Sequence, residues 1–190
     1  MFPESYDMMA MSIGTGAEDR CHELHVRINP LEHLLRNDLT LWHGGNLISP
    51  TFLPRSPEQA ATLSRNVIKQ STSADMRYLF TWNGLKGSGR GAQVEGFNVG
   101  GKTGTADKVV NGRYASDLNF NAFVAAFPMD KPKYMVLSII DAPKTGEHGG
   151  RTAASTAAPM VKEIIGRAAP LLGVQPRFGS NDVPYSLISY

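Results

Sequence analysis

The sequence is poor in cysteine and has no long hydrophobic run. Cys21 is the single cysteine, which excludes an internal disulfide framework but leaves the redox compartment open. No segment approaches the roughly 20 consecutive apolar residues that a membrane-spanning helix requires. The first residues, MFPESYDMMAMS, lack the basic start and apolar stretch of a signal peptide. As written, the chain is therefore expected to contain neither a membrane anchor nor a secretion signal.

The sequence also has little excess of positive over negative charge. The formal net charge is +2, and no run of lysine or arginine forms a basic arm, so a nucleic-acid partner is not expected. What is present is a chain of 190 residues, 42% of them apolar. Such a chain is long enough for one domain with a hydrophobic core.

The first clear element is a helix in the first half of the chain. Ser56 can cap this helix, Pro57 suits its first position, and Gln59 completes a capping box. Apolar residues then repeat at helical spacing as far as Ile68. The pattern therefore predicts one helix that continues through Ile68.

Further along, the pattern changes from helix to strands. A second helix, from Ser73 to about Asn83, should end in a glycine-rich loop over residues 83–92. Strands are expected over residues 102–110, 113–115, 120–127 and 134–141, followed by a helix over residues 153–169. Asn111-Gly112 predicts a hairpin turn, and the short PMDKPK link suits a second antiparallel connection. This order of elements indicates an α+β fold in which helices pack on an antiparallel sheet.

The segment GFNVGGKTGTADK, residues 96–108, fits two different motifs. Gly96 to Thr103 matches G-x-x-x-x-G-K-[ST], the phosphate-binding loop of nucleotide hydrolases, and Asp141 could then be a magnesium-binding carboxylate. Such a loop requires a buried strand before it and a helix after it, whose N-terminus binds the phosphates. The preceding AQVEG is short and polar, and the residues after Thr103 predict a hairpin. The nucleotide-binding alternative is therefore disfavoured.

In the other frame, Lys102-Thr103-Gly104-Thr105 is the K-T-G box of enzymes that penicillin acylates. An edge strand suits acyl transfer because its free backbone N–H groups can point at a substrate carbonyl. Gly104 lets a ligand approach the backbone closely. Lys102 supplies a positive charge for proton transfer or for a substrate carboxylate.

Other segments support this second interpretation, the K-T-G box. They are GGNLISPTFLPR (44–55), KGSGRGA (86–92), VEGFNVGGKTGTADK (94–108), FVAAFP (123–128), YMVLSIIDAP (134–143) and GGRTAA (149–154). Together, residues 44–167 closely resemble the C-terminal part of the transpeptidase domain of class B penicillin-binding proteins, the septal type used in division. The segments occur in the family's order and at family-like spacing, which makes the resemblance far more specific than K-T-G alone.

This resemblance implies the mixed α/β serine-transpeptidase and β-lactamase-like fold, represented by its C-terminal half. It also implies a serine-type D,D-transpeptidase that cross-links peptidoglycan during septum formation, without a metal or other cofactor. The implied ligand is the D-Ala-D-Ala end of a peptidoglycan stem peptide, or a β-lactam, and division proteins are implied partners. The implied location is the bacterial inner membrane, with this domain on the periplasmic face.

The resemblance also implies a role for each residue of the K-T-G box. Lys102 would hydrogen-bond the serine of an S-x-N motif and assist proton transfer. Thr103 and Thr105 would bind the ligand carboxylate, with Gly104 between them. The backbone N–H of Thr105 would be one oxyanion-hole donor. The predicted catalytic residues are thus Lys102 and Thr105, and the predicted substrate-binding residues are Thr103, Gly104 and Thr105.

The family's nucleophile motif does not occur in the sequence. The nucleophile is a serine in S-x-x-K, and no serine here has a lysine three positions later. The one S-x-N, Ser64-Arg65-Asn66, falls inside the helix predicted from Pro57 and is expected to be a solvated helix face. We therefore expect one wall of an active site without its nucleophile, and no activity of this chain alone.

Residues 17–42 depart from the family pattern. They separate the family-like MSIGTG (11–16) from HGGNL (43–47), where the pattern resumes. We hypothesise a local shift of the reading frame or a degraded gene copy with Met1 as an internal start. Translation of the other two frames of that DNA tests this hypothesis.

The same atypical segment contains metal-binding side chains, namely Cys21, His22, His25 and His33. His-Glu-Leu-His lacks the one-turn spacing of H-E-x-x-H, so the two histidines would not share a helix face. No metal site is therefore predicted.

The predicted organisation is a partial transpeptidase domain over residues 1–174, followed by a C-terminal tail over residues 175–190. The alternative to a catalytic relationship is a non-catalytic binding fragment or a gene remnant.

Overall fold

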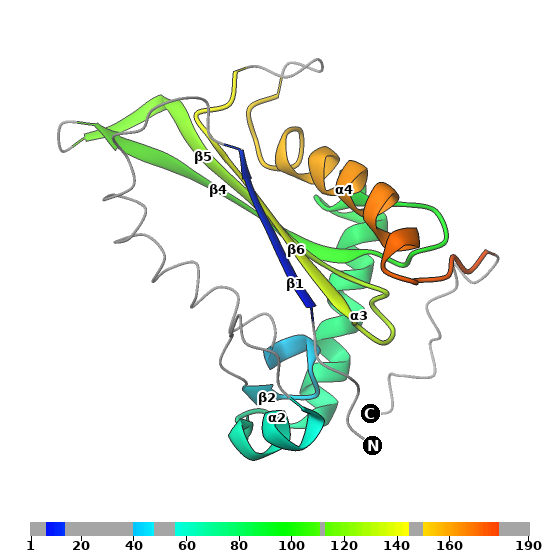
Figure 1. The fold of residues 1–190 in the computed structure, drawn as a ribbon. Coiled ribbons are helices and arrows are strands. Elements are labelled where there is room, and N and C mark those ends of the chain that lie inside the picture. Colours follow the sequence, from blue (N-terminus) through cyan, green and yellow to red (C-terminus); the bar gives the residue numbers. More distant parts are fainter. Residues whose placement is uncertain (1–6, 14–39, 48–55, 111–112, 145–149, 179–190) are drawn as a thin grey trace. The chain divides into compact units, whose positions relative to one another are not determined.

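The structure, a computed structural model, describes residues 7–13, 40–47, 56–110, 113–144 and 150–178 (Figure 1). It divides the chain into two compact units. Of the described residues, the first unit contains 40–47 and 56–77, and the second contains 7–13 and those from 78 onward. One helix runs from the first unit into the second.

The helices are α2 (Pro57–Leu63), α3 (Gln70–Lys86), the 3₁₀ turn η2 (Arg90–Ala92) and α4 (Ala157–Leu171). The strands are β1 (Asp7–Ile13), β2 (Asn46–Leu47), β3 (Arg65–Asn66), β4 (Gly100–Val110), β5 (Arg113–Phe127) and β6 (Tyr134–Asp141). Among the described residues, no helix is long and apolar enough to cross a membrane.

The start of α2 confirms the predicted capping box. The Ser56 side chain accepts a hydrogen bond from the Gln59 backbone N–H at 3.3 Å. The Gln59 side chain in turn accepts one from the Ser56 backbone N–H at 3.0 Å. Two N–H groups that the helix cannot pair internally are thereby satisfied.

The predicted end of this helix is wrong. α2 stops at Leu63, where Ser64 takes an extended conformation, and residues 65–66 form β3, which pairs antiparallel with β2. The helical spacing that reaches Ile68 is overridden because this strand pair forms instead. Ser64-Arg65-Asn66, predicted on a helix face, is therefore a helix cap followed by a strand with two exposed residues.

The second helix is longer than predicted at both ends. α3 begins at Gln70, before the expected Ser73, and continues to Lys86. The prediction of a loop over residues 83–92 is therefore wrong for 83–86, which are helical, and 90–92 form the 3₁₀ turn η2. The remaining part, 87–89, is the link between the two.

The second unit is built on a four-stranded sheet in the order β1-β6-β5-β4. β4, β5 and β6 form an antiparallel meander, as the sequence predicts. β5 is a single strand of 15 residues that joins the two shorter strands expected over 113–115 and 120–127. The predicted turn at residues 111–112 lies outside the described residues. β4 occupies one edge of the sheet (Figure 1).

β1 was not predicted. It pairs with β6 in parallel, from Asp7 opposite Tyr134 to Ile13 opposite Ile140. β1 therefore adds a parallel strand to the other edge of an otherwise antiparallel sheet.

α4 packs on one face of the sheet (Figure 1). Alternate residues of β5 point to the same face, and Phe123, Ala125 and Phe127 join Val161 and Ile165 of α4 in one buried cluster. The predicted helix over 153–169 is confirmed, although it begins four residues later and ends two residues later. The core thus lies between α4 and the strands β5 and β6.

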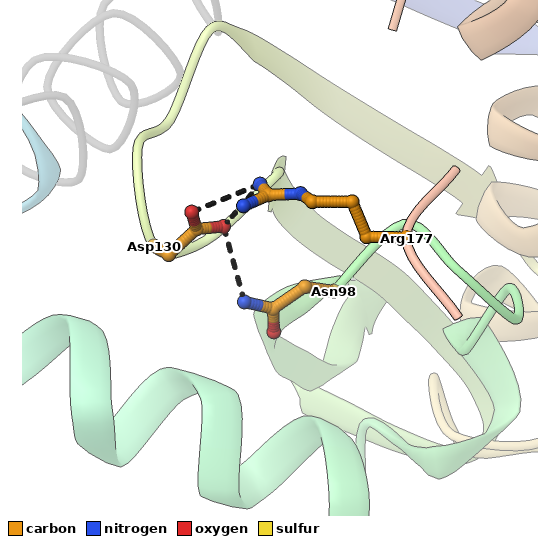
Figure 2. Close-up of polar contacts among 3 residues, drawn as sticks. All are labelled: Asn98, Asp130 and Arg177. Carbon is orange, nitrogen blue, oxygen red and sulfur yellow. Dashed lines mark hydrogen bonds and ion pairs between the residues drawn. The ribbon is translucent and has the colours of Figure 1, made fainter. Parts of the chain in front are cut away.

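Residues 174–178 pack against the turn that leads into β4. Asp130 accepts two hydrogen bonds of 2.9 Å from the Arg177 guanidinium and one of 3.3 Å from Asn98 (Figure 2). The Arg177 backbone N–H donates to the carbonyl of Gly96 at 2.8 Å. A Cβ on Gly96 would lie 2.8 Å from Pro176. Residues 175–178, predicted to be part of a tail, therefore belong to the second unit and bond to its Gly96 and Asp130.

This ion pair leads to a modest stability prediction. Because both side chains are about half exposed, solvent screens the pair, and Arg177→Gln should lower the free energy of unfolding by only about 0.5–1 kcal/mol. The matched control is Arg167→Gln, whose pair with Glu163 is longer, at 3.6 Å, and more exposed. Urea denaturation should show a loss for Arg177→Gln and none for the control. Equal losses would contradict a role for the Asp130 pair.

Candidate active site

The K-T-G-T segment lies in the edge strand β4, as the sequence predicts. Lys102 pairs with Val124 of β5, and Thr105 pairs with Asn121. Among the described strands, β4 has a neighbour on one side only. Lys102, Gly104 and Thr105 are exposed, whereas Thr103 is half-buried. Within the described part of the chain, the segment is thus held by the sheet on one side only.

A cation and two hydroxyls gather at Thr103. The Lys102 ammonium donates a 2.6 Å hydrogen bond to the Thr103 carbonyl and lies 3.5 Å from the Thr103 hydroxyl oxygen. The Ser88 hydroxyl lies 3.0 Å from the same Thr103 oxygen. One positive charge and two exchangeable O–H donors can together bind an anion such as a carboxylate.

Asn83, at the end of α3, holds Ser88 and β4 together. Its side-chain N–H donates to the carbonyl of Gly101 at 2.7 Å. Its side-chain oxygen accepts from the backbone N–H of Ser88 at 3.2 Å and lies 3.4 Å from the Ser88 hydroxyl oxygen. The predicted glycine-rich loop is therefore fixed beside the strand, because one amide side chain bonds to both.

Thr105 bonds to the segment that precedes α4. Its hydroxyl oxygen accepts a 3.0 Å hydrogen bond from the backbone N–H of Ala153. Ala153 belongs to the segment before α4. A hydroxyl that accepts one hydrogen bond can still donate its own proton. The exposed side of Thr105 therefore remains able to donate to a ligand.

The two glycines of the segment differ in the space around them. A Cβ on Gly104 would meet only Ala122, at 3.8 Å or more, which is ordinary contact. A Cβ on Gly101 would overlap the Val124 carbonyl oxygen and lie 2.9 Å from two ring carbons of Phe123. Packing within the chain therefore requires glycine at Gly101 but not at Gly104.

The charged residues farther along β4 bond to residues of β5 and β6. The Lys108 ammonium lies 2.7 Å from the Asp141 carboxylate, and Asn119 donates to Asp107 at 2.8 Å. Asp141 is the last residue of β6, so it is a strand-end residue rather than a magnesium ligand beside a phosphate loop.

The geometry does not support the interpretation of residues 96–103 as a phosphate-binding loop. Lys102 and Thr103 lie inside a strand that continues to Val110, and the next element is β5. A phosphate loop instead places these residues at a helix N-terminus, where amide groups bind the anion. The cluster of Cys21, His22, His25 and His33 lies outside the described residues. Among the residues that are described, no group of three or more His, Cys, Asp or Glu side chains could hold a metal ion.

Comparison with protein families gives a direct match. A family model described as the penicillin binding protein transpeptidase domain matches residues 6–166. The chain belongs to this family. The resemblance seen in residues 44–167 is thereby confirmed, and the family match extends to both sides of the atypical segment 17–42.

Curated relatives of this family are similar over most of the chain. Stage V sporulation protein D of Bacillus subtilis is 38% identical over 131 residues, which cover 68% of this chain and 20% of that protein. The probable peptidoglycan D,D-transpeptidase FtsI of Caulobacter vibrioides is 36% identical over 161 residues, which cover 79% and 27%. The probable peptidoglycan D,D-transpeptidase PenA of Neisseria meningitidis serogroup B is 35% identical over 148 residues, which cover 77% and 24%. The chain thus spans about a quarter of these relatives' length.

Solved structures show the same fold. The transpeptidase domain of penicillin-binding protein 3 from Burkholderia pseudomallei, in its apo form, has a TM-score of 0.68 and 29% identity, over 77% of this chain and 43% of that one. Penicillin-binding protein 3 from Mycobacterium tuberculosis, complexed with ampicillin, has a TM-score of 0.61 and 21% identity, over 77% and 36%. The predicted α+β transpeptidase fold is therefore confirmed.

Ser88 and Asn83 are the residues of this site that sequence reasoning missed. Ser88 lies in the GSGRG segment, whose glycines signal a tight loop. No spacing rule places that loop opposite Thr103. Only the fold of α3 back onto β4 brings the two hydroxyls together.

Proposed function

We propose that this chain forms the K-T-G-T wall of a serine D,D-transpeptidase site that binds the carboxylate of D-Ala-D-Ala or of a β-lactam. The proposal depends mainly on one observation, the convergence of the Lys102 ammonium with the hydroxyls of Thr103 and Ser88 on an edge strand. The 36% identity with a probable peptidoglycan D,D-transpeptidase supports the same reaction class.

The proposed roles follow the chemistry of the side chains. Lys102 carries the charge that attracts the carboxylate and assists proton transfer to and from a serine nucleophile. Thr103 and Thr105 lie two residues apart, so their side chains share one face of β4 and can donate to the carboxylate together. Gly104 leaves room for the ligand beside the backbone, and the Thr105 backbone N–H is one oxyanion-hole donor.

In this proposal, the nucleophile comes from outside the 190 residues. No serine in the sequence has a lysine three positions later, and the one S-x-N motif is Ser64-Arg65-Asn66, at the end of α2 and in β3. The rest of the transpeptidase domain would supply both motifs. The partial-domain organisation over residues 1–174 and the periplasmic, membrane-anchored setting of the whole protein belong to the same proposal.

Covalent labelling with a fluorescent penicillin tests the proposal. The chain alone should give no stable adduct on a denaturing gel, because no activated serine is present to be acylated. The matching segment of the Caulobacter vibrioides relative can be replaced by this chain to give a chimera. This chimera should become labelled. A stable adduct on the isolated chain would overturn the missing-nucleophile proposal. A correctly folded chimera that is never labelled would overturn the ligand-binding proposal.

A further inference from the structure

Asn121 is a buried polar residue directly behind the proposed site. It lies on β5 opposite Thr105 and has no exposed surface. Its side chain shares the face of β5 that carries Phe123 and the cluster under α4. An asparagine is an unusual choice at such a position, since burying an amide costs free energy unless its groups are hydrogen-bonded.

Both N–H groups of this amide go to the segment that precedes α4. The side-chain nitrogen of Asn121 donates to the Arg151 carbonyl at 2.7 Å and to the Thr156 hydroxyl oxygen at 2.9 Å. These two acceptors belong to the first and last residues of the segment 151–156, which we call the 151–156 loop. Asn121 therefore fastens both ends of the 151–156 loop to the sheet.

Within its ends, the 151–156 loop is closed by its own hydrogen bonds. The Thr152 carbonyl accepts from the backbone N–H of Ser155 and of Thr156, each at 3.1 Å. It also accepts from the hydroxyls of both residues, at 3.0 and 2.9 Å. These bonds tie Ser155 and Thr156 back to Thr152, so Ala153 lies in a loop that is closed on itself between its two fastened ends.

Ala153 is the point at which the 151–156 loop reaches the K-T-G-T strand. Its backbone N–H donates to the Thr105 hydroxyl oxygen at 3.0 Å. This bond occupies an acceptor site of the hydroxyl and leaves the Thr105 proton for another acceptor. The 151–156 loop thus bonds to the Thr105 hydroxyl through Ala153 and to Asn121 at both of its ends.

The side-chain oxygen of Asn121 points to the same conclusion. It is buried and has no hydrogen-bond partner among the described residues. An unpaired buried carbonyl destabilises a fold, so packing alone does not account for an amide here. What the amide contributes here is its two N–H donors, which bond to Arg151 and Thr156.

We propose that Asn121 is a positioning residue for Thr105, acting through the 151–156 loop to aim the Thr105 hydroxyl proton at the ligand carboxylate. This inference rests on the proposed function of Thr105 as a carboxylate donor. The positioning itself is a property of the free chain and can be tested without a ligand.

The first test is residue-resolved amide hydrogen exchange on the full 190-residue chain. Asn121→Leu removes both donors and the unpaired oxygen at similar volume, so the sheet should keep its stability while the Ala153 amide exchanges roughly tenfold faster. Core amides such as that of Val136 should not change. A general loss of stability would instead accelerate both amides together.

Further variants guard against misfolding of Asn121→Leu. Thr156→Val removes one acceptor of the Asn121 side chain and should accelerate Ala153 exchange in the same way. Ser138→Ala is the matched control, because Ser138 is equally buried on the neighbouring strand β6 but bonds to Met160 of α4. This control should leave the Ala153 amide unchanged.

The outcomes separate the two proposals. Unchanged Ala153 exchange in both Asn121→Leu and Thr156→Val would overturn the positioning role, whatever the chimera binds. In the labelled chimera, both Asn121→Leu and Thr105→Val should slow acylation by penicillin. A different result is also possible: Ala153 exchange is accelerated in Asn121→Leu and Thr156→Val, but the Thr105→Val chimera is acylated normally. That result would support the loop contact and overturn the function proposed for Thr105.

Discussion

Gly101→Ala is expected to destabilise the chain by about 3 kcal/mol or more, at the upper end of what overpacking costs in a close-packed core. The added methyl group would overlap the Val124 carbonyl oxygen, a backbone atom that cannot move without disturbing the β4–β5 pairing. It would also press on the ring of Phe123, which is fully buried. Such a loss is a large fraction of the 5–15 kcal/mol that stabilises a typical domain.

The matched control is Gly104→Ala, three residues further along the same strand. Its methyl group would make only ordinary contacts with Ala122, so its stability should stay within about 0.5 kcal/mol of the parent. Urea denaturation followed by circular dichroism measures both. Equal effects of the two substitutions would contradict the packing difference described here.

Gly104→Ala has a second use, because the chain's own packing does not require glycine at this position. If a ligand lies against the backbone of β4, the methyl group will hinder it. The folded Gly104→Ala variant of the chimera should therefore be acylated more slowly by penicillin than the parent chimera. Normal acylation would show that the ligand does not approach β4 at this point.

Lys102→Ala should reduce the rate of penicillin acylation of the chimera by roughly 10²–10⁴-fold, the range that a positioned proton-transfer group contributes. Lys102 is an exposed cation beside the Thr103 hydroxyl, so its loss would remove both the charge proposed for the carboxylate and the group proposed to assist proton transfer. The substitution should have little effect on stability, because an exposed lysine contributes little to packing. Stopped-flow or gel-based acylation rates measure the effect.

Two further lysine variants make this test specific. Lys108 lies on the same strand, but its ammonium pairs with Asp141. The acylation rate of the Lys108→Ala chimera should therefore match that of the parent chimera. Lys102→Arg keeps the charge but cannot give up its proton, so it separates charge from proton transfer. If Lys102→Ala acylates as fast as Lys108→Ala, the role proposed for Lys102 is wrong.

The sequence predicted those parts of the fold that depend on neighbouring residues. The capping box of Ser56 and Gln59 forms within four residues, and its geometry is confirmed. The strand β6 and its antiparallel link to β5 also follow from an apolar run and a short turn-rich connection. Local chemistry decides these features because every partner lies a few positions away.

Two of the failures of sequence reasoning concern pairings between distant segments. Helical spacing continued to Ile68, but residues 65–66 pair with residues 46–47, and this pairing ends α2 at Leu63. β1 was missed because its partner, β6, lies more than 120 positions away in the sequence. Propensity is a weak guide wherever a tertiary contact can override it.

By itself, the sequence determined the family and the K-T-G-T strand, because these depend on residue types at fixed spacing along the chain. Only the tertiary structure decided what surrounds that strand. The Ser88 hydroxyl reaches Thr103 since Asn83 bonds to both the loop and β4. The Ala153 amide reaches Thr105 across 48 positions of sequence. A folded chain chooses such contacts by packing and by satisfying buried hydrogen bonds, and neither leaves a pattern in the local sequence.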